Sequence, residues 1–248
     1  MLQNFESLVL IWLGIGFITF ITLLKIPAPY GKFSKTNWGP MIPSKLGWIV
    51  MEIISPLALL YFFLNGNMEK TPTNITFISL WTLHYLNRSV IYPLRQNNPA
   101  KMPLLIAVLA FLFNVMNGYI NGTYFGSIQE YSAEYMSNWN FIIGVCLFIT
   151  GAYINIKSDN ILLSLRSKSG EYKIPEGFMF RYVSFPNYLG EILEWMAFAI
   201  MTWSLAGLSF MIWTMANLVP RAIKGHQWYH SKFESYPKNR KAIFPFII

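Results

Sequence analysis

Residues 188–218 read YLGEILEWMAFAIMTWSLAGLSFMIWTMANL, an apolar stretch of 31 residues whose charges are Glu191 and Glu194. A helix that crosses a membrane needs about 20 such residues, so this stretch is too long for one crossing. The sequence Ser-Leu-Ala-Gly at residues 204–207 predicts a turn near its middle. We therefore divide the stretch there into two membrane-spanning helices.

The composition of the whole chain agrees with a membrane protein. Of its 248 residues 54% are hydrophobic, 17% aromatic and 12% charged. Soluble domains average about 25% charged residues, so this chain has too few charges for a soluble surface of its size. A soluble enzyme, a disordered chain and a fibrous protein are all poor fits. The single cysteine, Cys146, excludes a disulfide scaffold and a metal site built from several cysteines.

Five further apolar runs of membrane-spanning length precede this stretch, at residues 7–24, 46–64, 74–94, 102–120 and 140–156. With alternating loops, 17 of the 19 Lys and Arg residues fall on one side of a seven-span arrangement. Lys70 falls on the other side and Arg88 within the third span. The positive-inside rule then places the N-terminus outside and the C-terminus in the cytosol. Six spans would put the basic C-terminal tail on the side opposite the other basic loops, against the positive-inside rule.

We thus predict an all-α, polytopic membrane protein with seven transmembrane helices. We expect one transmembrane domain over residues 1–248, with the cytosolic loop 157–184 and the tail 220–248 forming one side. The net charge of +8 marks cytosolic loops, so no nucleic-acid partner is expected. The host membrane is the endoplasmic reticulum in a eukaryote or the inner membrane in a bacterium. We expect a monomer in contact with membrane lipid.

Four ionisable side chains lie within the spans, where a charge is costly and usually faces a partner or a wet cavity: Glu52, Arg88, Glu191 and Glu194. Glu52 lies seven residues from Lys45, and Tyr85 nine residues before Leu94. These offsets correspond to depths of roughly 10 and 13 Å from the cytosolic side. On neighbouring helices, a carboxyl group and a phenol at these depths can together bind and polarise a ketone oxygen. Two alternatives remain, a structural ion pair with Arg88 and a Tyr85 that belongs to an aromatic belt.

A second polar group lines the cytosolic half of the later spans. Asn187, Glu191 and Glu194 have helical i, i+4 and i+3 spacing, and Asn155 and Asp159 share the i, i+4 relation. A polar helix face that enters from the cytosol suggests a ligand cleft. Hydrogen bonding between helices through asparagine is the other reading.

The cytosolic loop and tail carry arginines and aromatic rings suited to a nucleotide's phosphates and bases. The residues of this group that we expect to bind a cofactor are Arg166, Tyr172, Arg221, His226 and Tyr229. A basic loop is, however, also what the positive-inside rule predicts, and anionic lipid headgroups would be attracted to it as well.

Several familiar motifs are absent from the sequence. It has no G-x-G-x-x-G after a strand and no G-x-x-x-x-G-K-[ST], so a nucleotide would be bound without a Rossmann or P-loop motif. Its three histidines are His84, His226 and His230, and no H-E-x-x-H pattern surrounds them. We therefore predict no metal site.

Five segments resemble the steroid 5α-reductase family. They are LHYLNR at residues 83–88, INIKSDNIL at 154–162 followed by Leu165-Arg166, YVS at 182–184, NYLGEILEW at 187–195 and FESYPKNRKAIFPF at 233–246. The resemblance extends from about residue 51 to the end and is densest after residue 143. It departs from the family at Met51, where glutamine is common, and at Gly225, in a tail run that is usually histidine-rich.

The resemblance implies a seven-helix membrane enzyme that reduces the C4–C5 double bond of a 3-oxo-Δ4-steroid with NADPH. Glu52 and Tyr85 match the family's pair that hydrogen-bonds the C3 carbonyl. Other positions match residues that hold NADPH, and Glu191 lies beside that site: Asn155, Asp159, Arg166, Tyr172, Asn187, Arg221 and Tyr229. The steroid, or a related lipid, is expected to enter from the bilayer.

Two other functions stay open. One is a related membrane reductase that acts on a sterol-nucleus double bond or an enoyl lipid. The other is a small transporter in which the buried glutamates relay protons. NADPH binding separates the reductases from the transporter.

Overall fold

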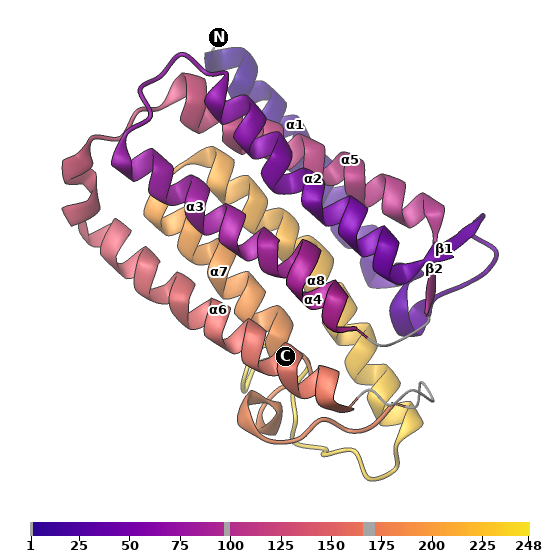
Figure 1. Ribbon diagram of the computed structural model, residues 1–248. Helices are drawn as coiled ribbons and strands as arrows, with labels where there is room; N and C mark the ends of the chain where they lie inside the picture. Colours follow the sequence, from indigo (N-terminus) through magenta and orange to yellow (C-terminus); the bar gives the residue numbers. More distant parts are fainter. Residues whose placement is uncertain (1, 97–99, 166–171) are drawn as a thin grey trace. The chain divides into compact units, whose positions relative to one another are not determined.

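The structure is a computed structural model that describes residues 2–96, 100–165 and 172–248 (Figure 1). The chain forms two compact units, each described here by itself. The first unit contains the residues up to Val9 together with Ala28–Ile142, and the second contains Leu10–Pro27 and Ile143–Ile248. Helix α1 (Leu2–Lys25) thus contributes its first two turns to one unit and the remainder to the other.

The first unit is built around three long helical segments. Its elements after α1 are η1 (Gly31–Phe33), β1 (Met41–Pro43), α2 (Ser44–Leu64), α3 (Pro72–Leu86), η2 (Asn87–Ile91), α4 (Tyr92–Arg95), β2 (Lys101–Pro103), α5 (Leu104–Thr123), η3 (Tyr124–Ile128) and η4 (Ala133–Ser137). α3, η2 and α4 follow one another without a break, and η2 is a π-helical segment.

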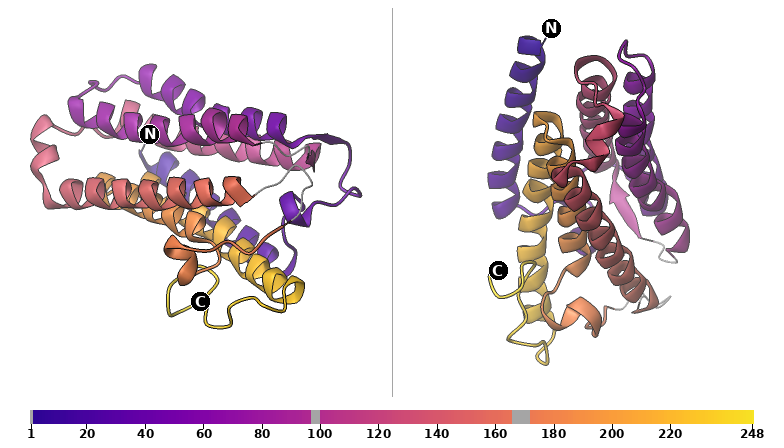
Figure 2. Two further views of the ribbon diagram at one scale, coloured as in Figure 1. Left: turned by 60° about the horizontal axis from the view of Figure 1, so that its bottom comes forward. Right: turned by 90° about the vertical axis from the view of Figure 1, so that its left-hand side faces the viewer.

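Helices α2 and α5 run parallel and in close contact (Figures 1 and 2). Both start directly after a strand of the antiparallel β1–β2 ribbon, in which Ile42 pairs with Met102. Two glycines of α5 allow the close approach: a Cβ on Gly118 would lie 2.6 Å from Ala58 Cβ, and one on Gly122 would lie 2.5 Å from Leu59 O. Small residues at such a crossing let two helix backbones approach within membranes.

The second unit holds α1 from Leu10 onward, α6 (Trp139–Leu165) from Ile143 onward, η5 (Phe178–Arg181), α7 (Pro186–Thr202), α8 (Leu205–Lys232) and the C-terminal tail. α1 is attached to α8 through Trp213, whose Nε1 donates to Trp12 O at 3.1 Å. The tail pairs with the segment before α7, since Val183 and Lys241 form a parallel β-bridge.

The predicted turn between the last two helices is confirmed. α7 ends at Thr202, Trp203 takes a left-handed backbone conformation with φ 46°, and the Ser204 side chain caps α8 by accepting from Gly207 N at 3.0 Å. The turn is tighter than predicted, because Leu205, Ala206 and Gly207 already belong to the first turn of α8. The Ser204 cap allows the helix to begin at once.

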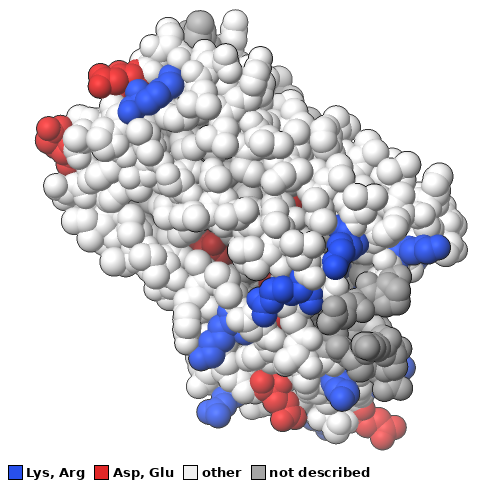
Figure 3. All heavy atoms as spheres, in the orientation of Figure 1, with Lys and Arg blue, Asp and Glu red and all other residues white. Residues whose placement is uncertain are grey.

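The prediction of a mostly helical chain is confirmed, with the short β1–β2 ribbon as an addition. Four helices in the described residues are long and apolar enough to cross a membrane: Leu2–Lys25, Ser44–Leu64, Leu104–Ile128 and Trp139–Leu165. On the face shown in Figure 3, charged side chains are sparse over the middles of the helices. Each of the seven predicted segments lies mainly on a helix, although the segment at residues 102–120 begins in β2. Seven crossings and the sides of the termini stay predictions. α7, with 17 residues, is shorter than a usual span.

Candidate functional site

Tyr85 lies in a buried polar cluster of the first unit. Its side chain, 5% exposed, donates from the hydroxyl to Asn114 Oδ1 at 3.3 Å. Asn114 Nδ2 in turn donates to the backbone carbonyl of Met51 at 2.6 Å. The phenol of α3 is therefore joined, through an amide of α5, to the α2 backbone immediately before Glu52.

The Tyr85 ring is also fixed from its own helix. The Trp81 ring stacks on it with centroids 5.7 Å apart and planes inclined by 24°. Trp81 Nε1 donates to Ser55 Oγ at 3.1 Å, which ties the stacked pair to α2. The His84 ring meets Tyr85 edge-on at 5.2 Å, so His84 is a neighbour within the cluster.

The backbone around Tyr85 departs from a regular α-helix. The π-helical segment η2 begins two residues after Tyr85, and Ser89 Oγ donates to Tyr85 O at 2.6 Å. Such segments are frequent at functional sites because they change the direction in which side chains point.

Glu52 is a partly buried residue of α2, the helix that contributes Met51 and Ser55 to the cluster. Their depths in the sequence allow Glu52 and Tyr85 to meet if their helices are neighbours. The Asn114 bridge joins the helices at this level, and the direct pairing of the two side chains stays a prediction. Arg88, the other ionisable residue within the predicted spans of this unit, lies over the rings of Trp48 and Tyr92, at 5.5 and 5.4 Å from their centroids.

A second buried cluster lies in the other unit, between α6 and α7. Asn155 Nδ2 donates to Asn187 O at 2.9 Å, and Asn187 Nδ2 donates to Asp159 Oδ1 at 3.1 Å. All three side chains are at most 7% exposed. The structure thus brings together three of the predicted cofactor residues, and Glu191 follows Asn187 by one turn of α7.

The residues of this cluster fit a polar ligand. Asn187 Oδ1 is buried and has no hydrogen-bond partner among the described residues. A buried amide oxygen left in this way loses about 1–3 kcal/mol of hydrogen-bonding free energy unless a ligand or water donates to it. The carboxamide and hydroxyl groups of a nicotinamide nucleotide are donors of the required kind.

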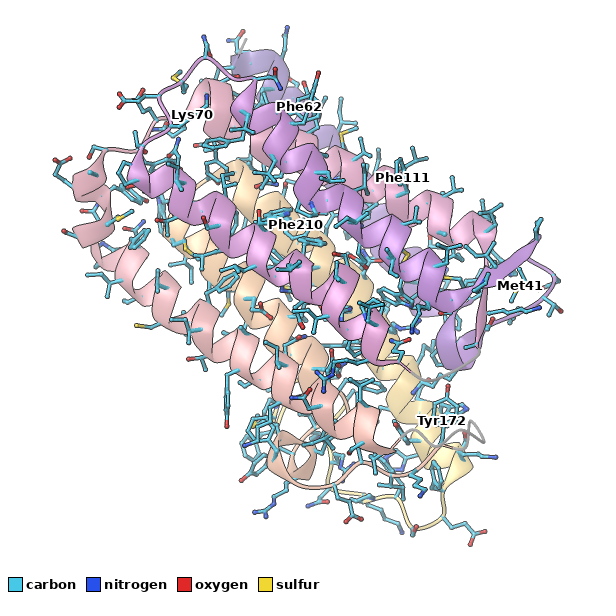
Figure 4. The ribbon with its side chains drawn as sticks, in the orientation of Figure 1. Met41, Phe62, Lys70, Phe111, Tyr172 and Phe210 are labelled. Atoms are coloured by element: carbon cyan, nitrogen blue, oxygen red, sulfur yellow. The ribbon has the colours of Figure 1, made fainter. Side chains whose placement is uncertain are left out.

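The predicted residues of α8 lie in the same unit. Arg221 Nε donates to Tyr188 OH at 3.0 Å, which connects α8 with α7. Tyr229 is 5% exposed and stacks on Tyr236 of the tail at 5.1 Å. The Tyr172 ring contacts Trp228 of α8 edge-on at 5.0 Å (Figure 4). Arg166 lies outside the described residues.

His226 takes part in a network that fastens the C-terminal tail. Its Nδ1 lies 2.6 Å from Ser184 Oγ, which also accepts from Tyr236 OH at 2.7 Å. Arg240 Nη1 donates to Tyr236 OH at 3.3 Å and to Pro175 O at 3.1 Å. Burial, and then the nearby His230, Arg240 and Lys241, lower the pKa of His226 to about 4. The imidazole is therefore neutral at pH 7, and cofactor binding by His226 stays a prediction.

The structure adds residues that the sequence analysis missed: Asn114, Trp81, Ser55, Ser184, Tyr236 and Arg240. The sequence contains a pattern that could have indicated Asn114 as a buried polar residue. Asn114, Asn117 and Asn121 repeat at helical spacing within an apolar segment. In residues 2–96, 100–165 and 172–248, no three His, Cys, Asp or Glu side chains gather in a group that could hold a metal ion.

Comparison with known proteins shows the family of this chain. Residues 100–248 match the family model described as 3-oxo-5-alpha-steroid 4-dehydrogenase. The chain is 44% identical over 248 residues to a tomato (Solanum lycopersicum) protein named steroid 5-alpha-reductase DET2, covering 98% of this chain and 96% of the relative. It is 37% identical over 238 residues to the rat (Rattus norvegicus) 3-oxo-5-alpha-steroid 4-dehydrogenase 1, covering 94% and 91%. The human protein of that name is 35% identical over 238 residues, covering 94% and 92%. This chain belongs to the 3-oxo-5-alpha-steroid 4-dehydrogenase family.

Proposed function

We propose that this protein reduces the C4–C5 double bond of 3-oxo-Δ4-steroids to 5α-3-oxosteroids with NADPH. The observation that carries the proposal is the buried Tyr85 hydroxyl, which Asn114 joins to the α2 backbone one residue before Glu52, in a chain whose relatives are named for this reaction. The apolar helices around it suit a substrate that enters from the bilayer.

In the proposed mechanism, Tyr85 and Glu52 donate hydrogen bonds to the C3 carbonyl of the steroid. Withdrawing electron density through this oxygen makes C5 electron-poor, because C5 is conjugated with the carbonyl. The same donors stabilise the negative charge that appears on the oxygen when C5 is reduced. A proton added at C4 then completes the saturated ketone.

The second unit holds the cofactor in this proposal. When bound, NADPH supplies the hydride that C5 accepts. Asn155, Asp159 and Asn187 hold its polar groups, with Asn187 Oδ1 as a buried acceptor. Further contacts come from Arg166, Tyr172, Glu191, Arg221, His226 and Tyr229. Orientation is the contribution of these residues, since a fixed geometry removes much of the entropic barrier.

A direct assay tests the proposal. Detergent-purified protein is given NADPH and progesterone, the absorbance of the reduced nicotinamide is followed, and the steroid product is analysed by mass spectrometry. We expect a product two hydrogens heavier, and a large loss of turnover in Glu52→Gln. Cofactor binding by a folded protein that reduces no 3-oxo-Δ4-steroid would exclude this substrate class, and a folded protein that does not bind NADPH would exclude a reductase.

A further inference from the structure

Asn114 is a buried polar residue in the middle of a helix that is apolar enough to cross a membrane. Its side chain is 3% exposed, and α5 places it against α2 on one side and α3 on the other. Asparagine at such a depth needs hydrogen-bond partners from neighbouring elements. Asn114 has one partner on each neighbouring helix, the Tyr85 hydroxyl and the Met51 carbonyl.

The Met51 carbonyl determines which way the Asn114 amide faces. A carbonyl oxygen only accepts hydrogen bonds, so the Asn114 atom that lies 2.6 Å from it must be the NH₂ group. The amide oxygen is consequently turned to Tyr85, and a flipped amide would set two oxygens against each other at that distance. The Tyr85 O–H therefore points at Asn114 in the absence of a ligand.

The two hydrogen bonds of Asn114 differ in strength. At 2.6 Å the bond to the Met51 backbone is short, whereas the bond from Tyr85 is 3.3 Å long. O–H···O bonds are usually about 2.7–2.8 Å long, so the Tyr85 bond is a weak one. Asn114 is thus a firmly held acceptor, and the Tyr85 hydroxyl can turn its weak hydrogen bond from Asn114 to a better acceptor.

We propose that Asn114 is a positioning residue for the reaction proposed above, on which this inference rests. It accepts a hydrogen bond from the Tyr85 hydroxyl between turnovers, while the Trp81 ring supports the phenol, and it releases that hydrogen bond when the C3 carbonyl of the steroid arrives. The bond from Tyr85 to the carbonyl replaces the bond to Asn114, and no proton is transferred in this exchange. Without Asn114, the Tyr85 hydroxyl loses the acceptor that orients its hydrogen before the steroid arrives.

The same helix provides a matched control. Asn121 lies two turns further along α5 and is fully buried, and its Nδ2 donates to Asn117 O within the helix at 3.1 Å. Asn121→Ala removes a buried side-chain amide from α5, as Asn114→Ala does. It therefore reports the general consequence of such a loss for the fold.

The test is a double-mutant cycle in kcat for the steroid, with Asn114→Ala, Tyr85→Phe and the double variant. We expect Asn114→Ala to lower kcat by about tenfold or more, as coupled neighbours do, and to leave the KM for NADPH unchanged. In the Tyr85→Phe background the same substitution should have no further effect, because the hydroxyl it positions is already absent. Asn121→Ala should leave kcat close to the parent value in both backgrounds. If Asn114→Ala does not fold, Asn114→Ser takes its place in the cycle.

The possible results separate this inference from the proposed function. An active parent in which Asn114→Ala lowers kcat equally with and without the Tyr85 hydroxyl would show a structural role and overturn the assignment. So would an Asn114→Ala variant that behaves like Asn121→Ala. A folded parent that reduces no 3-oxo-Δ4-steroid would overturn the proposed function, and the assignment with it.

Discussion

At the scale of single residues, the Tyr85 hydroxyl should contribute more to the rate than to substrate binding. Tyr85→Phe keeps the ring stacked on Trp81 and removes only the hydrogen-bond donor. If that donor stabilises charge on the C3 oxygen, kcat should fall by about 10²–10³-fold. Steady-state kinetics with progesterone measure the effect, and turnover close to that of the parent would remove Tyr85 from the mechanism.

Asn187 should control cofactor affinity. Asn187→Ala removes the buried Oδ1 acceptor and leaves Asp159 without the Asn187 donor. A buried polar group that loses its hydrogen-bond partner costs about 1–3 kcal/mol, so the Kd for NADPH should rise by roughly five- to 100-fold. Quenching of tryptophan fluorescence on NADPH addition provides the measurement.

The control for Asn187 is another buried asparagine, Asn140, which belongs to the first unit. Its Nδ2 donates to Tyr135 OH at 2.6 Å. Asn140→Ala should leave the Kd for NADPH unchanged. Equal affinities of the parent and Asn187→Ala would contradict a cofactor site between α6 and α7.

The sequence could predict site residues where a polar group breaks an apolar pattern at helical spacing. Asn155, Asp159 and Asn187 were found in this way, and the structure brings them together. Asn114 does not stand out in the sequence, because an amide within a span is uncharged and has a structural explanation as well. The Ser184, Tyr236 and Arg240 network depends on where the tail folds back, which no local pattern contains.

At the scale of helices, Gly190 should be essential to the contact between α6 and α7. A Cβ at this position would lie 2.5 Å from Asn155 N and 2.6 Å from Gly151 O, both in the backbone of α6. Gly190→Ala must therefore push the helices apart, which typically destabilises a well-packed protein by about 1–3 kcal/mol. Because Asn155 lies at the contact, NADPH binding should weaken too.

Gly14 in α1 is the control for Gly190, since a Cβ there would meet nothing within 4 Å. Gly14→Ala should be neutral or should raise stability by up to about 1 kcal/mol, because alanine favours the helix. Thermal unfolding in detergent compares the two variants. An unchanged Tm for Gly190→Ala would show that α6 and α7 are not packed as closely as described.

The stability of the folded protein should depend on pH through His226, which contacts the C-terminal tail. Its pKa in the folded protein is about 4, below its ordinary value of 6.5, so the unfolded chain takes up the proton more readily. The stability that comes from a neutral His226 is complete above pH 6.5 and is lost as the pH falls from 6.5 towards 4. His226→Gln should therefore show a flatter decline of Tm over this range than the parent. Parallel Tm–pH curves would contradict the burial of a neutral imidazole.

The helices could be predicted from the sequence because apolar runs and turn residues are local signals. The split at Ser204 is an example, since one side chain both ends the turn and caps the helix. The β1–β2 ribbon and the π-helical segments could not be predicted. The strands have three residues each and depend on pairing between segments about 60 residues apart, and a π-helix has the same apolar pattern as the α-helix that it interrupts.

At the scale of the whole molecule, the direction of the helices agrees with alternating crossings. α2 and α5 are parallel and belong to the second and fourth predicted spans, which must run the same way through a membrane. Lys70, predicted to lie on the side opposite most of the basic residues, donates from Nζ to the carbonyls of Gly66 and Met68, each at 2.7 Å (Figure 4). Whether the two units form one transmembrane domain stays a prediction.

The topology of the chain is the prediction at this scale. Seven crossings put the two termini on opposite sides, whereas six or eight would put them on the same side. Because 17 of 19 Lys and Arg residues fall on the side of the C-terminus, that end should be cytosolic. In sealed microsomes, protease added from outside should remove a tag placed after Ile248 and spare a tag placed before Met1. Detergent should expose both tags, which controls for a tag that is buried within the protein. Removal of both tags from sealed microsomes would require an even number of crossings. The seven-span arrangement would then be wrong, and α7 and α8 would not be two separate crossings as predicted.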